Sequence, residues 1–179
     1  GADIMNLIDD KDNQINTKLV DLFLVGCLCA DYKNRLMWSH YADSHKGFCI
    51  EYDYNNLTED EMASLPLPIV YSKERPLLPW KAALENTPEN ISEATAQITL
   101  GLLTKDDEWR YENEWRILVS SKGPTEFKMP KISCIYLGVA ISDENKAKIL
   151  EIAKRKNILV KQMKIDRGTY AMHAATIIN

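Results

Sequence analysis

Long hydrophobic runs, glycine, proline and an excess of basic residues are all scarce in this sequence of 179 residues. Seven Gly and seven Pro are too few for a collagenous or low-complexity chain. No apolar run approaches the roughly 20 residues of a membrane helix, and the acidic, polar N-terminus is unlike a secretory signal. A formal net charge of -4 gives no general basic surface for duplex nucleic acid. We therefore expect a soluble, cytoplasmic protein that binds neither membranes nor duplex nucleic acid.

Cysteine is also sparse, and its spacing excludes the common zinc sites. Cys27 and Cys29 form a C-x-C pair, while Cys49 and Cys134 stand alone, so no second pair completes a metal-binding set. All four lie in apolar runs typical of strands. We predict buried, reduced thiols, which suit a cytosolic protein.

Hydrophobic patterning predicts short strands that often follow one another directly, with helices between some of them. Strands are expected at 22–29, 47–54, 65–72, 109–120, 125–129, 132–138, 158–166 and 169–178, and helices at 37–47, 87–102 and 143–156. The apolar run at 22–29 suggests a buried strand, and the prolines within 65–72 suggest an edge position. The sum is an α+β fold with a mixed or mainly antiparallel sheet of about seven strands and three or four helices. We expect a polar segment at 1–18 and a single domain over 19–179.

Capping residues predict where the three helices begin and end. Ser142 starts the third helix and Asn157 stops it. Thr87 and Pro88 suit the first positions of the second helix, and Gly47 suits the end of the first.

The segment WRYENEWR, residues 109–116, has two interpretations. As a strand it has an aromatic face and a charged face, with Glu112 and Glu114 about 7 Å apart and flanked by Arg110 and Arg116. On a solvated face these four charges form a structural ladder. In a cleft, one carboxylate would stay ionised while the other binds substrate hydroxyls. The sequence leaves both interpretations open.

A second segment rich in polar and aromatic residues, WSHYADSHKG at 38–47, also has two interpretations. Trp38 and Tyr41 suit the anchoring of a helix onto a sheet. Alternatively, the block is a ligand platform in which the rings stack on a ligand and Ser39, His40 and His45 supply hydrogen bonds. The two histidines are five residues apart and do not align on a helix face, so we predict no metal site. No phosphate-binding glycine loop, G-x-S-x-G or H-E-x-x-H motif occurs.

Taken together, the segments 38–52, 69–72, 109–116 and 135–138 resemble a widespread bacterial domain-of-unknown-function family. Its signatures are MWxHYAxxHxGxCIEY and WxYExEWR, and the resemblance extends over roughly residues 22 to 170. Family members begin with a further segment carrying an Asn-Asp-Pro-like motif. Because that motif is not found here and Gly1 does not look like a natural start, we expect an N-terminally truncated copy.

The E-x-E pair with an upstream aromatic, Ser and His block is also similar to mono-ADP-ribosyltransferases, which cleave NAD without a metal. This resemblance implies that Glu114 is catalytic and stabilises an oxocarbenium-like transition state, and that Glu112 orients the acceptor. Tyr41 or His40 would contact the nicotinamide. One of the arginines of residues 109–116 would meet the diphosphate.

Three hypotheses follow. The first is a cytosolic transferase that uses NAD as its substrate and needs no firm cofactor. The second is a non-catalytic regulatory module that binds a nucleotide, another small molecule or a peptide in stress or phage defence. The third is a metal-dependent hydrolase built on His40, His45 and a glutamate.

Overall fold

The computed structural model describes residues 23–76, 88–121 and 128–178. Within them the predicted α+β class is confirmed: nine strands form three sheets, accompanied by three α-helices and two 3-10 helices. The described residues fall into two compact units. The first comprises 23–28, 66–76 and 88–121, and the second comprises 29–65 and 128–178. The prediction of one domain over 19–179 stays a prediction, and those on residues 1–18 and Thr87 lie outside the described residues.

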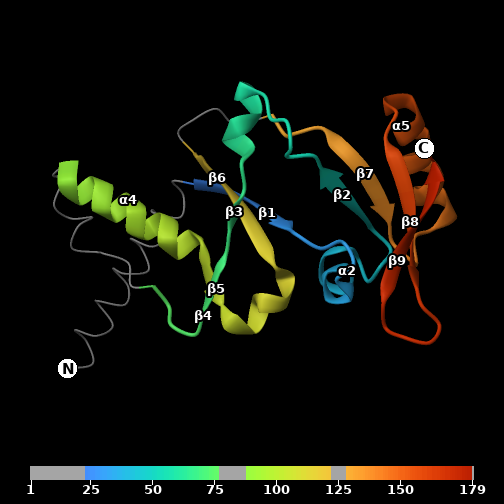
Figure 1. The fold of residues 1–179 in the computed structure, drawn as a ribbon, viewed down its shortest axis with the longest axis horizontal. Coiled ribbons are helices and arrows are strands. Elements are labelled where there is room, and N and C mark those ends of the chain that lie inside the picture. The colour runs from blue at the N-terminus through green and yellow to red at the C-terminus, as the bar shows by residue number, and fades with distance from the viewer. Residues whose placement is uncertain (1–22, 77–87, 122–127, 179) are drawn as a thin grey trace. The chain divides into compact units, whose positions relative to one another are not determined.

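The first unit contains a three-stranded sheet in the order β1-β6-β3 and a separate parallel pair, β4 and β5 (Figure 1). Its elements are β1 (Phe23–Cys29, ending at the unit boundary), β3 (Leu67–Pro68), β4 (Val70–Ser72), α4 (Pro88–Leu102), β5 (Thr104–Asp106), the 3-10 helix η2 (Asp107–Glu112) and β6 (Glu114–Ser120). β3 lies at the edge of its sheet, as its proline predicts, because Pro68 has no N–H to donate.

Two predictions for this unit need correction. The strand expected at 65–72 is divided, because β3 and β4 pair with different strands on either side of Ile69. The strand at 22–29 is confirmed as β1, but it is not fully buried, since Leu24, Val25 and Cys27 are exposed. Gly26 is the position that lies against Ile117 of β6. A continuous apolar run does not show that both faces of a strand are covered.

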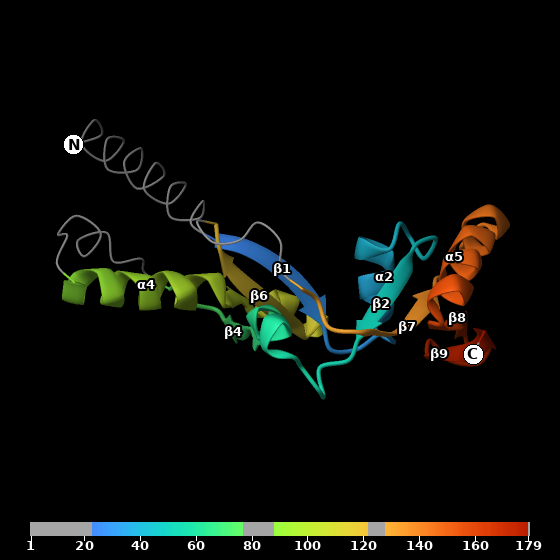
Figure 2. The same ribbon diagram turned by 90° about the horizontal axis from the view of Figure 1, so that it is seen from above.

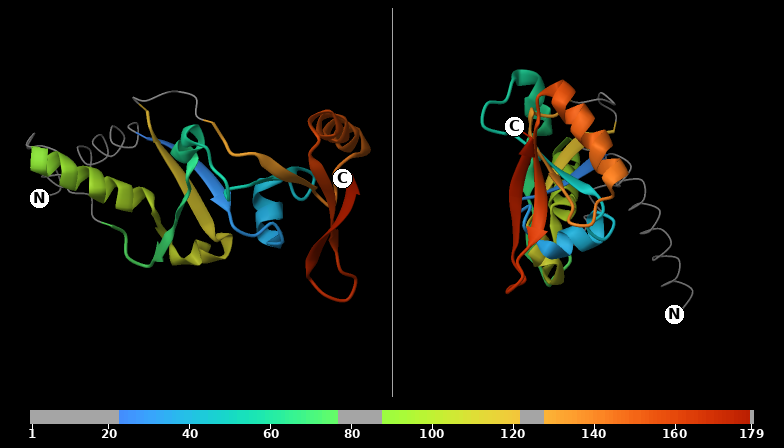
Figure 3. Two further views of the ribbon diagram at one scale, coloured as in Figure 1. Left: turned by 45° about the horizontal axis from the view of Figure 1, so that its top comes forward. Right: turned by 90° about the vertical axis from the view of Figure 1, so that its right-hand side faces the viewer.

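The second unit is built on a mixed sheet in the order β2-β7-β8-β9. Its elements are α2 (Arg35–Tyr41), β2 (Phe48–Tyr52), the 3-10 helix η1 (Glu59–Ser64), β7 (Ile132–Leu137), α5 (Asp143–Lys156), β8 (Leu159–Ile165) and β9 (Met172–Ile178). β7 and β8 are parallel and are joined through α5, whereas β2–β7 and the β8–β9 hairpin are antiparallel (Figure 3). The predicted strand at 125–129 is not seen in its described part, since Lys128 and Met129 belong to no strand.

Strand alternation gives this sheet two apolar faces. On one face, Leu137 and Val160 pack with Ala153 of α5, and α5 runs beside β8 (Figure 2). On the other face, Tyr136 and Met163 pack with Trp38 of α2. The core of the second unit therefore lies on both sides of one sheet.

The helix ends of this unit test the capping predictions. The Ser142 side chain accepts a hydrogen bond from the Asn145 N–H, and α5 ends at Asn157 in the left-handed conformation, so both predictions are confirmed. The end of α2 is different, because the helix stops at Tyr41 and not at Gly47.

Three successive left-handed residues, Asp43, Ser44 and His45, carry the chain from α2 towards β2. Gly47 is required for a different reason from the predicted cap. A Cβ there would lie 3.1 Å from the carbonyl oxygen of Ala42. The glycine therefore permits a close backbone contact.

Candidate functional site

The segment 109–116 is not one strand. Its first part belongs to η2, which the Asp106 side chain caps by accepting a hydrogen bond from the Glu108 N–H. Asn113 then adopts the left-handed conformation, with φ of 46°, and β6 begins at Glu114. The strand prediction is therefore confirmed for 114–120 and wrong for 109–113. Asparagine adopts this left-handed conformation more readily than most residues, which explains why the change from η2 to β6 occurs at Asn113.

Both glutamates of the segment are buried, which contradicts the interpretation as a solvated ladder. Glu112 and Glu114 are 2% and 5% exposed. The ammonium of Lys105, on β5, bridges them: it donates to Glu112 Oε2 and, at 2.9 Å, to Glu114 Oε2. Arg116 donates from Nε to Glu114 Oε1 at 2.7 Å and from Nη2 to Oε2 at 3.2 Å. We call Lys105, Glu112, Glu114 and Arg116 the carboxylate cluster.

The backbone around the cluster is also held in place. The Glu114 N–H donates to the hydroxyl oxygen of Tyr71 at 2.8 Å, which ties the start of β6 to β4. The Arg116 guanidinium donates to the carbonyl of Leu102 at the end of α4. Four elements of the first unit thus fix the positions of the two carboxylates.

The electrostatics of the cluster keep Glu114 ionised. Burial alone would raise the pKa of its carboxyl, but hydrogen bonds from Arg116, Cys27 and Lys105, together with the charge of Arg116, outweigh burial and lower the pKa to about 2. Burial would lower the pKa of Lys105, yet the two glutamates hold it above its ordinary value. The thiol pKa of Cys27 is raised by partial burial and by Glu114.

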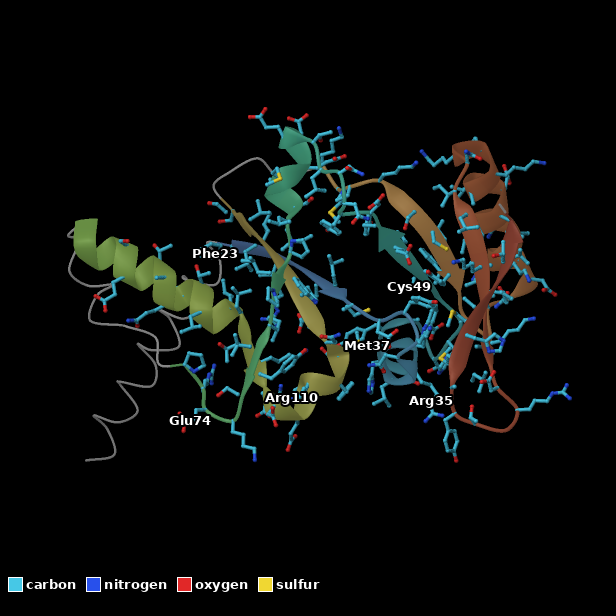
Figure 4. All side chains as sticks on the ribbon, viewed as in Figure 1. Phe23, Arg35, Met37, Cys49, Glu74 and Arg110 are labelled. Carbon is cyan, nitrogen blue, oxygen red and sulfur yellow. The ribbon has the colours of Figure 1, made fainter. Side chains whose placement is uncertain are left out.

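A hollow of about 250 Å³ opens beside the cluster in the first unit. Residues 72–76, which follow β4, and residues 104–106 of β5 line it, and Lys105 belongs to both the hollow and the cluster. Glu74 lies in the segment that follows β4, and Arg110 lies on η2 (Figure 4). Arg110 is exposed and pairs with Asp107, so it does not join the carboxylates.

The residues of the 38–47 block differ in how deeply they are buried. Trp38 is 3% exposed in the core of the second unit, and its indole N–H donates to the Tyr32 carbonyl at 2.7 Å, so its predicted anchoring role is confirmed. Tyr41 is 64% exposed, so its predicted anchoring role is wrong. Ser39 and His40 are also exposed, and the His40 ring meets the Tyr41 ring edge-on at 6.3 Å.

Ser39 and His45 contact each other directly. Ser39 Oγ lies 3.1 Å from His45 Nε2 and 3.2 Å from the carbonyl oxygen of Arg35. His45 Nδ1 is buried and has no hydrogen-bond partner in the described part of the chain. The simplest arrangement has Nε2–H donating to Ser39, whose own hydroxyl donates to Arg35, because every donor is then satisfied.

The second unit contains a set of hydrogen-bonded polar side chains that the sequence did not indicate. Glu51 of β2 accepts hydrogen bonds from Ser133 Oγ and Tyr136 Oη of β7, both at 2.5 Å. Tyr136 stacks on Tyr32 with ring centres 4.1 Å apart. Burial, and then Glu51, raise the pKa of the Tyr136 hydroxyl, so it acts as a neutral donor. Only the pairing of β2 with β7, which brings Glu51 opposite Cys134, unites these side chains.

The cysteines are free thiols, as predicted, but only some of them are buried as predicted. All four are free thiols. Cys134 is buried, Cys29 and Cys49 are half-buried, and Cys27 is exposed, which corrects the prediction for that residue. Among the described residues no group of three or more His, Cys, Asp or Glu side chains is placed to hold a metal ion. Nor do the described helices include one long and apolar enough to cross a membrane.

The 38–47 block and three members of the carboxylate cluster, Glu112, Glu114 and Arg116, lie in the two segments whose signatures define the predicted resemblance. Residues 37–117 match the family described as protein of unknown function (DUF2971). The predicted resemblance to an uncharacterised domain family is thereby confirmed, over a shorter range than residues 22 to 170. No curated protein and no solved structure matches the chain. The similarity to ADP-ribosyltransferases stays a prediction.

Proposed function

We propose that the chain is an NAD-using mono-ADP-ribosyltransferase in which Glu114 is the catalytic carboxylate. The observation that carries the proposal is the ionised, immobilised state of Glu114. Its pKa is about 2, Arg116 binds both of its oxygens, and Tyr71 fixes its backbone. A carboxylate held in this way is suited to stabilising positive charge that develops on a ribose ring.

A contribution to the stability of the fold does not explain well why such charged side chains are buried together. Burying two carboxylates costs several kcal/mol per ion, and an apolar group of similar volume often stabilises a fold as well or better. Titratable groups with perturbed pKa values that border a hollow are more typical of functional sites. Lys105 contacts both glutamates and lines the hollow, so it connects the carboxylate cluster to the hollow.

In the proposed reaction, the bond between ribose C1′ and the nicotinamide nitrogen breaks, and its electron pair leaves with neutral nicotinamide. Glu114 stabilises the resulting oxocarbenium-like ribose and accepts a hydrogen bond from a ribose hydroxyl. Glu112 orients the acceptor, whose nucleophilic atom bonds to C1′ and loses its proton to solvent water. We place this chemistry in the cytoplasm, where the free thiols remain reduced.

The test is label transfer from radioactive NAD to proteins of a cell extract, together with release of nicotinamide. We expect Glu114→Gln to abolish both and Glu112→Gln to impair transfer more than nicotinamide release. Asp107→Asn removes a half-buried carboxylate of η2 that lies outside the carboxylate cluster, and it should retain activity. Each variant is first checked for its fold by circular dichroism. Equal turnover by folded Glu114→Gln and unaltered protein would refute the proposal.

A second candidate is the non-catalytic binding module, favoured by the exposure of Ser39, His40 and Tyr41 on one short helix. An exposed tyrosine ring beside a histidine can stack on a nucleotide base. In nuclear magnetic resonance titrations with ATP and NAD, we expect shifts in these three residues that Tyr41→Ala removes. Shifts confined to the first unit would instead favour the transferase.

A further inference from the structure

The hollow beside the carboxylate cluster lies where two parallel strands end. Ser72 is the last residue of β4 and Asp106 the last of β5, and the two are register partners. The chain that leaves β4 forms the rest of the wall, as residues 73–76. Crevices at the carboxyl ends of parallel strands are common binding sites for phosphate-bearing ligands in α/β sheets.

One side chain of this wall has a hydrogen left to donate. The Lys105 ammonium is already engaged, because it donates to Glu112 and Glu114 and lies 5.0 Å from the centre of the Trp109 ring. The Ser72 hydroxyl oxygen accepts from the Glu74 N–H at 3.0 Å, and this leaves its own hydrogen to donate. The Glu74 N–H holds the Ser72 hydroxyl in place before a ligand arrives.

The charges around the hollow favour a small anion over a cation. Lys73 and Arg75 line the hollow and are exposed, so they can turn towards a ligand. Of the two acids in the lining, Asp106 is committed to capping η2. The other, Glu74, is exposed and can turn into solvent.

We infer that this hollow is a phosphate subsite, in which Ser72, Lys73 and Arg75 bind a phosphate or diphosphate group. Its volume of about 250 Å³ suits such a group and not a whole dinucleotide, since drug-sized ligands occupy about 300–1,000 Å³. The inference rests on the proposed function for the identity of the nucleotide, NAD, whose diphosphate would lie here. The subsite therefore replaces the arginines of residues 109–116 as the diphosphate contacts.

The test is isothermal titration calorimetry of the full chain with pyrophosphate and with ADP-ribose. We expect binding that weakens about tenfold or more in Lys73→Gln/Arg75→Gln, because two charge-assisted contacts are lost. Ser72→Ala should weaken binding by a smaller factor. Lys148→Gln, an exposed lysine of α5, is the matched control and should bind unchanged.

These outcomes separate the subsite from the transferase. Binding that depends on Lys73 and Arg75 without NAD turnover would support the subsite and refute the transferase. Turnover with the same KM for NAD in unaltered protein and in Lys73→Gln/Arg75→Gln would overturn the subsite alone. No pyrophosphate binding at millimolar concentration, or equal binding by all variants, would likewise overturn it.

Discussion

The carboxylate cluster should make the stability of the first unit depend on pH in the acidic range. The pKa of Glu114 lies at about 2 in the folded protein, below its ordinary value of 4.5. The folded state therefore binds the Glu114 proton less tightly than the unfolded state does. The stabilisation is fully present above pH 4.5 and is lost as the pH falls towards 2.

The magnitude follows from the same pKa values. At about 1.4 kcal/mol per unit of pKa, the drop from 4.5 to about 2 corresponds to at most roughly 3 kcal/mol. Lys105 and Arg116 remain 20% and 17% exposed, so solvent screens part of their attraction. We therefore expect Glu114 to contribute about 2 kcal/mol at neutral pH, and Glu114→Gln to lose at least this amount.

The assay is urea unfolding at pH 7, 5, 3.5 and 2.5, followed by circular dichroism and by tryptophan fluorescence, to which Trp109 and Trp115 of the first unit contribute. Between pH 5 and 2.5, the free energy of unfolding should fall less steeply for Glu114→Gln than for the unaltered protein. Asp107→Asn should keep the unaltered slope and lose less than about 0.5 kcal/mol, because its ion-pair partner Arg110 is exposed to solvent. If Glu114→Gln keeps the same acid slope, the carboxylate is not ionised by its neighbours and our reasoning fails.

Three further predictions concern packing and thiol chemistry. Gly138→Ala should lower the melting temperature by several degrees in a thermal scan, because its Cβ would lie 2.8 Å from a backbone carbonyl oxygen, whereas Gly168→Ala meets nothing within 4 Å and should be neutral. Tyr136→Phe should cost about 1 to 3 kcal/mol in urea unfolding, because it removes the donor to a half-buried carboxylate; no change would contradict that hydrogen bond. Burial raises the pKa of Cys49 to about 12, and the thiol pKa of Cys27 is also raised, but Cys27 is exposed, so iodoacetamide at pH 8 should modify Cys27 before Cys49, as peptide mass spectrometry can show.

Local sequence predicts those elements whose ends and faces are set by local chemistry. Ser142 and Asn157 define α5 because a capping side chain and a left-handed asparagine act within one turn of the helix. The prediction fails for α2, which ends well before Gly47. There the left-handed turn is stabilised by the second unit as a whole: the Ala140 N–H donates to the carbonyl of His45, and Gly138 leaves room for that carbonyl.

The two glutamates show why a candidate site is harder to predict than a helix. An E-x-E spacing fixes the distance between carboxylates only if both lie on one strand, and Asn113 ends the 3-10 helix between them. What makes the pair unusual is Lys105, seven residues before Glu112 and on a different strand, together with Tyr71 from a third strand. No local pattern marks either residue, because an isolated lysine or tyrosine is ordinary in any strand. The chemical state of Glu114 therefore depends on tertiary contacts as well as on the local Arg116, and Lys105→Met should expose the tertiary part: it leaves the E-x-E sequence and Arg116 intact but should raise the pKa of the Glu114 carboxyl, measurable by carbon-13 titration.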